Sequence, residues 1–404
     1  MRTKFLFIFL YIFFGTLFSQ TISIPDPNFK LKIIADGVDT NGDGEIQVSE
    51  ALATTQLDVR SLNNDPNKIT NLQGIEYFGN LIELNCSGNL LSTLDVTALT
   101  SLQILKAYFN ELTSINVTGL VNLENLWVSG NQLPSLDLST LQNLKWIFCS
   151  DNQLTALDLS ALQSLETIWA DNNQIETLDL LPQTNLGYII VANNLLDHLD
   201  VNHLSDLEIL YASNNNIDAI DVSNMPNLQI LDVGGNQLEE IDCSSTGVDH
   251  LHCDNNPDLI SINVQNGVIS YSDPDGLDFG FLFYNLPSLE SICMDPGEEQ
   301  ALADSGYDPE NVVIYTGPNC TLSNTSFNVA NTYVYPNPVD SDFNLSAFEN
   351  ITNYFLYDSL GRSITASTDY QFVKAKINSL QSGLYFLKIE TLDISSETLR
   401  FVKK

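Results

Sequence analysis

A unit of 21 residues repeats through the middle of the chain and restricts its fold more than any other feature. The first leucine of the unit recurs at a spacing of 21, and the last unit follows after 20 residues. These positions are Leu81, Leu102, Leu123, Leu144, Leu165, Leu186, Leu207, Leu228 and Val248. A fixed period of this length predicts a solenoid, in which each unit buries its apolar face only against its neighbours.

Each unit also contains the pattern of a short strand. An apolar residue lies three positions after the first leucine, and a small residue lies two positions further on. The apolar positions are Leu84, Leu105, Leu126, Ile147, Ile168, Ile189, Leu210, Leu231 and Leu251, and the small ones are Cys86, Ala107, Val128, Cys149, Ala170, Val191, Ala212, Val233 and Cys253. This period of two is typical of a strand that buries one face.

Two polar columns follow in each unit. The first is Asn89, Asn110, Asn131, Asn152, Asn173, Asn194, Asn215, Asn236 and Asn256. Because a buried amide must form hydrogen bonds, we expect each Asn to hold the backbone of its own turn and of the next. The second is Asp95, Asn116, Asp137, Asp158, Asp179, Asp200, Asp221, Asp242 and Asn263. We expect its side chains to accept backbone N–H groups in their own turns, with metal binding as the alternative.

The repeat L-x-x-L-x-(C/A/V)-x-x-N-x-L-x-x-L-D-V-S over residues 81–264 resembles the short bacterial form of the leucine-rich repeat (LRR). The resemblance implies a mainly β fold, a solenoid with a parallel concave sheet. With 21 residues per coil there is little room for a convex α-helix, so we expect extended or single-turn segments there.

The N-terminus has the pattern of a targeting segment. Arg2 and Lys4 precede the apolar run 5–14, and small or polar residues follow to Gln20. Because the run is too short to cross a bilayer comfortably, residues 1–20 are predicted to be a cleaved signal peptide. We expect no membrane-spanning segment elsewhere.

Charge is distributed unevenly. The chain has a net charge of −36, with 43 acidic and 6 basic side chains in residues 21–332 against 8 and 7 in residues 333–404. A surface of this sign repels phosphate backbones, which excludes nucleic acid as a partner. Cations and basic proteins remain possible partners, and plain solubility is the alternative explanation.

Residues 21–80 are predicted to form an N-terminal cap with a helical stretch around 29–35. Within it, DTNGDGEIQVSE (39–50) fits the EF-hand calcium loop. The expected Ca²⁺ ligands are the side chains of Asp39, Asn41, Asp43 and Glu50 and the carbonyl of Glu45. Hard oxygen ligands at this spacing suit a structural Ca²⁺ and suit Zn²⁺ poorly. The alternative is an acidic turn that binds nothing.

Residues 265–320 break the repeat register and are predicted to form the C-terminal LRR cap. Cys86 and Cys149 lie three coils apart, about 14 Å at strand spacing, which is beyond disulfide reach. We expect them, Cys243 and Cys253 to be buried thiols. In similar bacterial LRR proteins a pair placed like Cys293 and Cys320 closes the end of the solenoid, so the resemblance implies a disulfide there.

Residues 321–332 have linker composition, and residues 333–404 resemble the type A C-terminal sorting domain of type IX secretion cargo. The motifs are PNP (336–338), YD-x-LGR (357–362), L-x-SGLY (380–385) and the basic end. The resemblance implies a small β-sandwich that engages the type IX machinery of a diderm bacterium. Such a domain is usually cleaved, leaving a secreted or surface-attached protein. A retained adhesive domain is the alternative.

Aromatic residues collect on the solvent-facing side of the strands, two and four positions after the first leucine. The predicted ligand-binding residues are Trp127, Trp146, Phe148, Trp169, Tyr188 and Tyr211. A polar rim of Asn85, Asn125, Asp171 and Asp232 is expected around them. We therefore expect a binding protein that captures a protein, peptide or glycan and is not an enzyme. The alternative is that the rings bind nothing and only stabilise the strands by stacking.

A second candidate site lies at the far end of the strands. His250 and His252 face the same way with Asp254, and Asp232 lies beside His252. This corner leaves open a metal-binding protein or metal-dependent enzyme. The sequence has no nucleophile motif and no phosphate loop, so it assigns no catalytic residue.

Overall fold

The structure, a computed structural model, describes residues 20–62, 64–269, 280–304, 312–316, 334–335, 339, 343–345, 351–358, 362–391 and 396–404. Residues 1–19 of the expected signal peptide, the expected linker 321–332 and Cys320 lie outside the described residues. The chain divides into two compact units, Met1–Leu322 and Ser323–Lys404, which are described separately.

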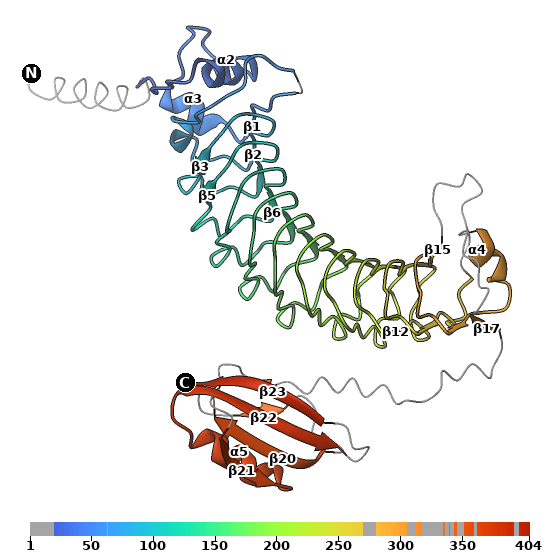
Figure 1. Cartoon of the computed structure of the whole chain (residues 1–404). Helices are drawn as coiled ribbons and strands as arrows, with labels where there is room; N and C mark the ends of the chain where they lie inside the picture. The colour runs from blue at the N-terminus through green and yellow to red at the C-terminus, as the bar shows by residue number, and fades with distance from the viewer. Residues whose placement is uncertain are drawn as a thin grey trace, which may run out of the picture. The chain divides into compact units, whose positions relative to one another are not determined.

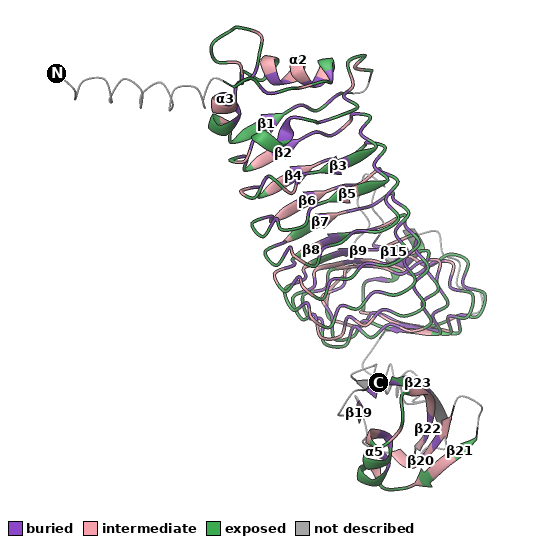
Figure 2. Ribbon diagram, turned by 90° about the vertical axis from the view of Figure 1, so that its left-hand side faces the viewer, coloured by how far each residue is buried: buried purple, intermediate pink, exposed green. Residues whose placement is uncertain are grey.

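The first unit opens with a small helical cap, as the sequence predicts. Helix α2 (Pro27–Ala35) buries Phe29 and Ile33, and helix α3 (Val48–Ala53) follows the loop 39–47. Asp26 begins α2 by accepting the backbone N–H groups of Asn28 and Phe29. Figure 2 shows both helices at the N-terminal end of the stacked coils.

One parallel sheet of eleven strands runs through the described coils. Its strands, in spatial order, are β1 (Gln56–Asp58), β2 (Glu83–Asn85), β4 (Ile104–Lys106), β6 (Asn125–Trp127), β7 (Trp146–Phe148), β8 (Thr167–Trp169), β9 (Tyr188–Ile190), β10 (Ile209–Tyr211), β11 (Ile230–Asp232), β13 (His250–His252) and β15 (Phe281–Leu282). Figure 1 shows this sheet on the concave side of the coils. The predicted solenoid with a parallel concave sheet is therefore confirmed.

The convex side contains only short extended segments. They are β3 (Thr93–Asp95) paired with β5 (Ser114–Asn116), and the sheet of β12 (Glu240–Asp242), β14 (Ser261–Asn263), β16 (Ser291–Cys293) and β17 (Val313–Tyr315). Residues 81–264, all of them described, contain no helix. Short helices flank this stretch, η1 (Ile75–Tyr77) before it and α4 (Glu299–Asp304) after it.

The asparagine column forms a buried ladder, but its direction differs from the prediction. The amide of Asn173 donates to the carbonyls of Ala170 and Asp171 in its own coil and of Cys149 in the preceding coil. Its Oδ1 accepts the N–H of Leu154, also in the preceding coil, at 3.0 Å. The predicted link to the next coil is wrong, because each amide bonds to its own coil and to the preceding one.

The aspartate column behaves as expected. Each of its nine side chains, from Asp95 to Asn263, accepts the backbone N–H two residues further on. The backbone N–H and hydroxyl of Thr97 hold the pKa of Asp95 below its usual value. These carboxylates therefore stabilise turns.

A third column was not predicted. One residue per coil adopts a positive φ just before the ladder asparagine, at Gly88, Phe109, Gly130, Asp151, Asn172, Asn193, Asn214, Gly235 and Asn255, and Asn285 has the same conformation before Leu286. Gly, Asn and Asp tolerate this left-handed backbone, whereas a bulky side chain is an outlier there. Phe109, at φ 52°, is that outlier.

The second unit is a mainly β domain, in agreement with the predicted sandwich. It contains an antiparallel sheet in the order β21 (Ser363–Ser367), β20 (Ile351–Asp358), β22 (Gly383–Thr391) and β23 (Ser396–Lys403), and the pair β18 (Val334–Tyr335) and β19 (Asn344–Leu345). Helix α5 (Tyr370–Asn378) was not predicted. It buries Val373 and Ile377 in the same core as Leu356 and Leu387.

The cysteines behave as structural residues. Cys86, Cys149, Cys243 and Cys253 are free and buried. Burial raises the pKa of the Cys86 and Cys149 thiols to about 12, so these side chains stay protonated. Cys293 is disulfide-bonded. Because Cys320 lies outside the described residues, its pairing with Cys293 stays a prediction.

Candidate functional site

The predicted aromatic residues lie in two neighbouring columns of the concave sheet. Strand register pairs Trp127 with Phe148 and Phe148 with Trp169, and it aligns Trp146 and Tyr188 on either side of β8. Trp146, Trp169 and Tyr188 expose 41, 43 and 40 % of their surface. Trp127, Phe148 and Tyr211 are half-buried.

The rings of one column touch in sequence along the solenoid. Ring centroids lie 4.9 Å apart for Trp127 and Phe148 and 5.0 Å apart for Phe148 and Trp169. Tyr108 continues the row, 6.1 Å from Trp127, and Phe109 packs edge-on against Tyr108 at 5.6 Å. We call the aromatic residues of both columns, together with Tyr108 and Phe109, the aromatic ridge. Its members are Tyr108, Phe109, Trp127, Trp146, Phe148, Trp169, Tyr188 and Tyr211.

Tyr108 and Phe109 were missed because they follow the strand. The alternation of the strand carries no information about the turn beyond it. A signal was nevertheless present, since Phe109 stands where the other coils have Gly, Asn or Asp.

A lysine covers one end of the ridge. Lys106 Nζ lies 5.5 Å from the ring centroid of Trp127 and 2.6 Å from Glu83 Oε1. The indole N–H of Trp127 is buried and has no hydrogen-bond partner. Asn85, which was expected on the polar rim, is instead buried and accepts hydrogen bonds from Ser87, because its coil lies next to the cap.

Glutamates form one edge of the ridge. Trp146 Nε1 donates to Glu166 Oε2 at 3.3 Å, and Tyr188 Oη donates to Glu208 Oε2 at 2.7 Å. The hydrogen bond to Glu208 and its negative charge raise the pKa of Tyr188. Each ring is therefore oriented by a carboxylate of the following coil.

Asp171 borders the other edge, just beyond β8, and Asp232 continues the ring column beside Tyr211. Asp171 accepts hydrogen bonds from Ser150 Oγ and from Asn172 Nδ2, and Asp232 accepts from Ser213 Oγ at 2.9 Å. Burial raises the pKa of Asp232, and the Asp254 carboxylate acts in the same direction, while hydrogen bonds and His252 oppose both. The ridge is thus bordered by carboxylates on two sides.

The histidine corner contains one close contact between a histidine and a carboxylate. His250 Nδ1 lies 2.7 Å from Asp249 Oδ1. Among the residues that the structure describes, no group of three or more His, Cys, Asp or Glu side chains is placed to hold a metal ion.

The loop 39–50 has the backbone of its predicted motif. Gly44 has φ 79°, the turn expected at the sixth position, and the carbonyl of buried Ile46 accepts the N–H of Ile22. Asp39 accepts the N–H groups of Gly42 and Gly44. Glu50 accepts those of Thr40 and Gln47.

The oxygen-rich residues of this loop fit the chemistry of Ca²⁺. Their carboxylates, however, accept hydrogen bonds from the loop's own amides. Among the described residues, which include this loop, no group of three or more His, Cys, Asp or Glu side chains is placed to hold a metal ion. Glu45, whose carbonyl is the expected ligand, uses its side chain to pair with Lys30 at 2.6 Å.

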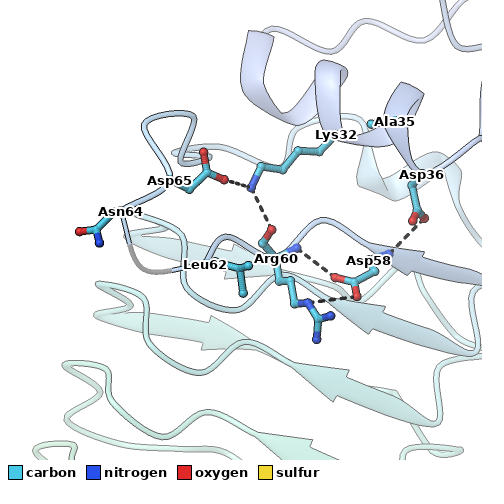
Figure 3. Close-up of a pocket in the computed structure, with 8 residues that line it drawn as sticks. All are labelled: Lys32, Ala35, Asp36, Asp58, Arg60, Leu62, Asn64 and Asp65. Carbon is cyan, nitrogen blue, oxygen red and sulfur yellow. Dashed lines mark hydrogen bonds and ion pairs between the residues drawn. The ribbon is translucent and has the colours of Figure 1, made fainter.

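A depression in the cap, of about 660 Å³, is a separate feature (Figure 3). Lys32 donates to Asp65 and to the carbonyl of Arg60, and Arg60 pairs with Asp58. Burial raises the pKa of Asp36, against the hydrogen bond from the N–H of Asp58. Lys32 and Arg60 are already paired with aspartates, so we assign no ligand to this depression. Its residues connect α2 to β1.

Comparison with protein families identifies both parts of the chain. The family described as secretion system C-terminal sorting domain matches residues 333–404. Leucine-rich repeat families match residues 122–144, 142–183 and 205–246. The chain therefore carries leucine-rich repeats and a type IX sorting domain, which gives an extracellular or cell-surface location. No helix in the described residues is long and apolar enough to cross a membrane.

The solved structures compared with this chain are distant from it in sequence. The functional domain of InlJ from Listeria monocytogenes is 21 % identical with a TM-score of 0.40, covering 96 % of this chain and 99 % of its own. The internalin inlF of the same species is 20 % identical with a TM-score of 0.47, covering 72 % and 95 %. An LRR protein of Leptospira interrogans is 20 % identical with a TM-score of 0.40, covering 66 % and 73 %. No curated protein matches the chain. None of these likenesses supports an argument about the ligand.

Proposed function

We propose that this secreted LRR protein captures a protein, peptide or glycan on the aromatic ridge. The observation that carries the proposal is the contiguous row of partly exposed rings on the concave sheet. A continuous exposed aromatic patch usually marks an interaction site, and Trp and Tyr dominate the binding energy of interfaces.

The solenoid itself does not require these rings. Its interior columns are filled by fully buried residues such as Leu126, Ile147 and Ile168. Stacking between rings on neighbouring strands contributes only about 0.2–1 kcal/mol per pair. Stacking can account for Trp127 and Phe148, whose rings touch. It does not account for the exposed indole of Trp146.

The experiment compares the purified protein with its Trp127→Ala/Trp169→Ala variant. The probes are an oligosaccharide array and a panel of acidic, neutral and basic peptides. We expect at least one class of probe to bind the protein and to bind the variant about 30-fold more weakly, equivalent to about 2 kcal/mol. Circular dichroism and Tm should change little.

The matched control is Tyr77→Ala/Phe372→Ala, which removes two exposed aromatic residues outside the ridge. It should bind like the parent. Equal binding by the Trp variant, or no binding of any probe by the parent, contradicts the proposal.

We also propose that the loop 39–50 binds one structural Ca²⁺. Support comes from the complete set of oxygen-bearing residues and the left-handed Gly44. The ion would tie the loop to α3 through Glu50 and so strengthen the cap. The expected ligands are Asp39, Asn41, Asp43, Glu50 and the Glu45 carbonyl.

A further inference from the structure

We propose that the occupant of the aromatic ridge is a basic polypeptide segment whose Lys or Arg side chains lie on the rings between the bordering carboxylates. This inference rests on the proposed function and names the partner class. It is argued from charge complementarity and from the hydrogen bonds of the rings.

The concave face has an excess of negative charge. Glu166 and Glu208 border one side of the ridge, Asp171 borders the other, and Asp232 continues the ring column beside Tyr211. Residues 81–264 contain only two Lys or Arg side chains, Lys106 and Lys145, and both are already paired with a glutamate of the preceding coil. A neutral sugar chain would leave the remaining charge uncompensated, whereas a cationic segment would neutralise it.

The carboxylates also prepare the rings for a cation. Trp146 and Tyr188 donate their polar hydrogens to Glu166 and Glu208. A hydrogen bond donated to an anion polarises the donor and adds electron density to its ring. The ring face then attracts a cation more strongly, and the same carboxylate lies at hand to receive a Lys or Arg N–H.

The protein contains a related arrangement, in which the carboxylate holds the cation over the ring but does not bond to the ring N–H. Lys106 Nζ lies over the Trp127 ring while it bonds to Glu83. The same three components, a ring, a carboxylate and a cation, are brought together there by the chain itself. At Trp146 and Tyr188 the ring and the carboxylate are present, and the partner would supply the cation.

The spacing of these ring and carboxylate pairs points to a conformation for the segment. Trp146 and Tyr188 lie two strands apart, a separation of about 9.6 Å at 4.8 Å per strand. A polyproline II helix repeats its side-chain direction every three residues, about 9.3 Å. A β-strand repeats every two residues, about 6.7 Å. The polyproline II period matches and the β period does not.

Three synthetic peptides test the inference by fluorescence anisotropy with the purified protein. The probe is Arg-Pro-Pro repeated three times. Gln-Pro-Pro repeated three times removes the charge, and three consecutive Arg followed by six Pro keeps the charge but changes the spacing. We expect the neutral peptide to bind at least about tenfold more weakly than the probe, and the clustered peptide several-fold more weakly. Equal binding of the neutral peptide overturns the inference, and equal binding of the clustered one overturns the spacing.

Paired variants separate a local effect from general attraction. Glu166→Gln/Glu208→Gln should weaken the Arg-Pro-Pro probe by about tenfold or more. Glu111→Gln/Glu176→Gln removes the same charge at exposed positions outside the ridge and should change binding by less than about twofold at 0.15 M salt, where distant charges are screened. An equal loss in both variants would mean non-specific attraction and would overturn the inference.

Cellohexaose distinguishes this inference from the proposed function. If cellohexaose binds and the Arg-Pro-Pro probe does not, and Trp127→Ala/Trp169→Ala abolishes the sugar binding, the ridge is a binding site with a different occupant. In that case only this inference fails. If neither probe depends on the two tryptophans, both proposals fail.

Discussion

The ring of Phe109 occupies the space that a side chain on Gly130 would need. The two residues hold the same position in successive coils, with φ 52° and 67°, and a Cβ on Gly130 would overlap the Phe109 ring. Phe109 is also 63 % exposed, so its ring gains little from burial. A strained backbone thus presents an aromatic side chain at the edge of the aromatic ridge.

Replacing Phe109 with Asn should stabilise the protein and weaken binding. Asn is the residue that several other coils use at this left-handed position. Relief of strain is expected to raise the free energy of unfolding by about 1 kcal/mol. Urea denaturation measures this change, and anisotropy with a ridge-binding probe measures the loss of affinity. A variant that is less stable than the parent would show that the ring contributes more than the strain costs.

Gly130→Ala should destabilise the protein in a way that depends on Phe109. The left-handed backbone alone costs about 1 kcal/mol for a residue with a Cβ. The displaced Phe109 ring adds to this cost. The additional cost should vanish in a Phe109→Gly background, which has no side chain at this position, and a double-mutant cycle measures the difference. An identical cost in both backgrounds would argue against the contact.

Asn173→Ala should be among the most damaging substitutions in the solenoid. It leaves the N–H of Leu154 without a partner, whereas the carbonyl of Cys149 keeps the amide of Asn152. The unsatisfied N–H costs about 1–3 kcal/mol and the lost amide hydrogen bonds add to it, so a loss of about 2–4 kcal/mol is expected. Asn143→Ala is the control, because this exposed amide donates only to the carbonyl of Val121. Similar losses in the two variants would refute a special role for the ladder.

The stabilisation given by Asp26 should depend on pH. Burial acts to raise the pKa of this carboxyl, but hydrogen bonds from Thr70, Phe29 and Asn71 outweigh it and hold the pKa below the usual value. A lowered folded pKa gives stability that is present above the unfolded pKa, about 3.9, and is lost as the pH falls through the folded pKa.

Asp26→Ala should therefore reduce the free energy of unfolding by about 2 kcal/mol at pH 7, through loss of the helix cap and of the bonds to Thr70. The difference from the parent should shrink between pH 4 and about pH 2, as measured by urea denaturation at each pH. Asp179→Ala, at an exposed turn, is the control. A difference that stays constant over this range would contradict the assignment.

Calcium should raise the Tm of the protein if the loop 39–50 binds it, with an affinity of about 10⁻⁴–10⁻³ M, as in extracellular modules. Glu50→Gln should abolish the calcium-dependent rise, whereas Glu45→Gln should retain it, because position 45 is expected to supply only its carbonyl. Calorimetry and thermal denaturation with and without calcium measure both effects. No calcium heat with the parent protein would end the calcium hypothesis.

Much of the solenoid could be predicted because its periodicity is one-dimensional. The alternation of Leu126 and Val128 fixes which side of β6 is buried, and the repeat spacing fixes the register of Trp127 with Phe148. The two ring columns follow from these facts alone. Their contacts with Glu166 and Glu208 do not, because those residues lie one coil further on.

The parts that escaped prediction lack such a period. The column of left-handed residues could not be recognised at Phe109, because phenylalanine does not indicate a positive φ. Asn85 resembles the other strand residues, yet it is buried because its coil meets the cap rather than another equivalent coil. Helix α5 depends on tertiary packing of Val373 and Ile377, which a nine-residue segment does not specify by itself.

The direction of the asparagine ladder has a consequence for how this protein can change its length. Outside its own coil, each ladder amide bonds only to the coil before it. Removing or duplicating one complete 21-residue unit therefore leaves each remaining asparagine with equivalent backbone partners. Tandem duplication can therefore lengthen the recognition surface in steps of one strand, about 4.8 Å each. The length of the surface that a partner can contact is therefore set by the number of repeats, and it can change without any change inside a single coil.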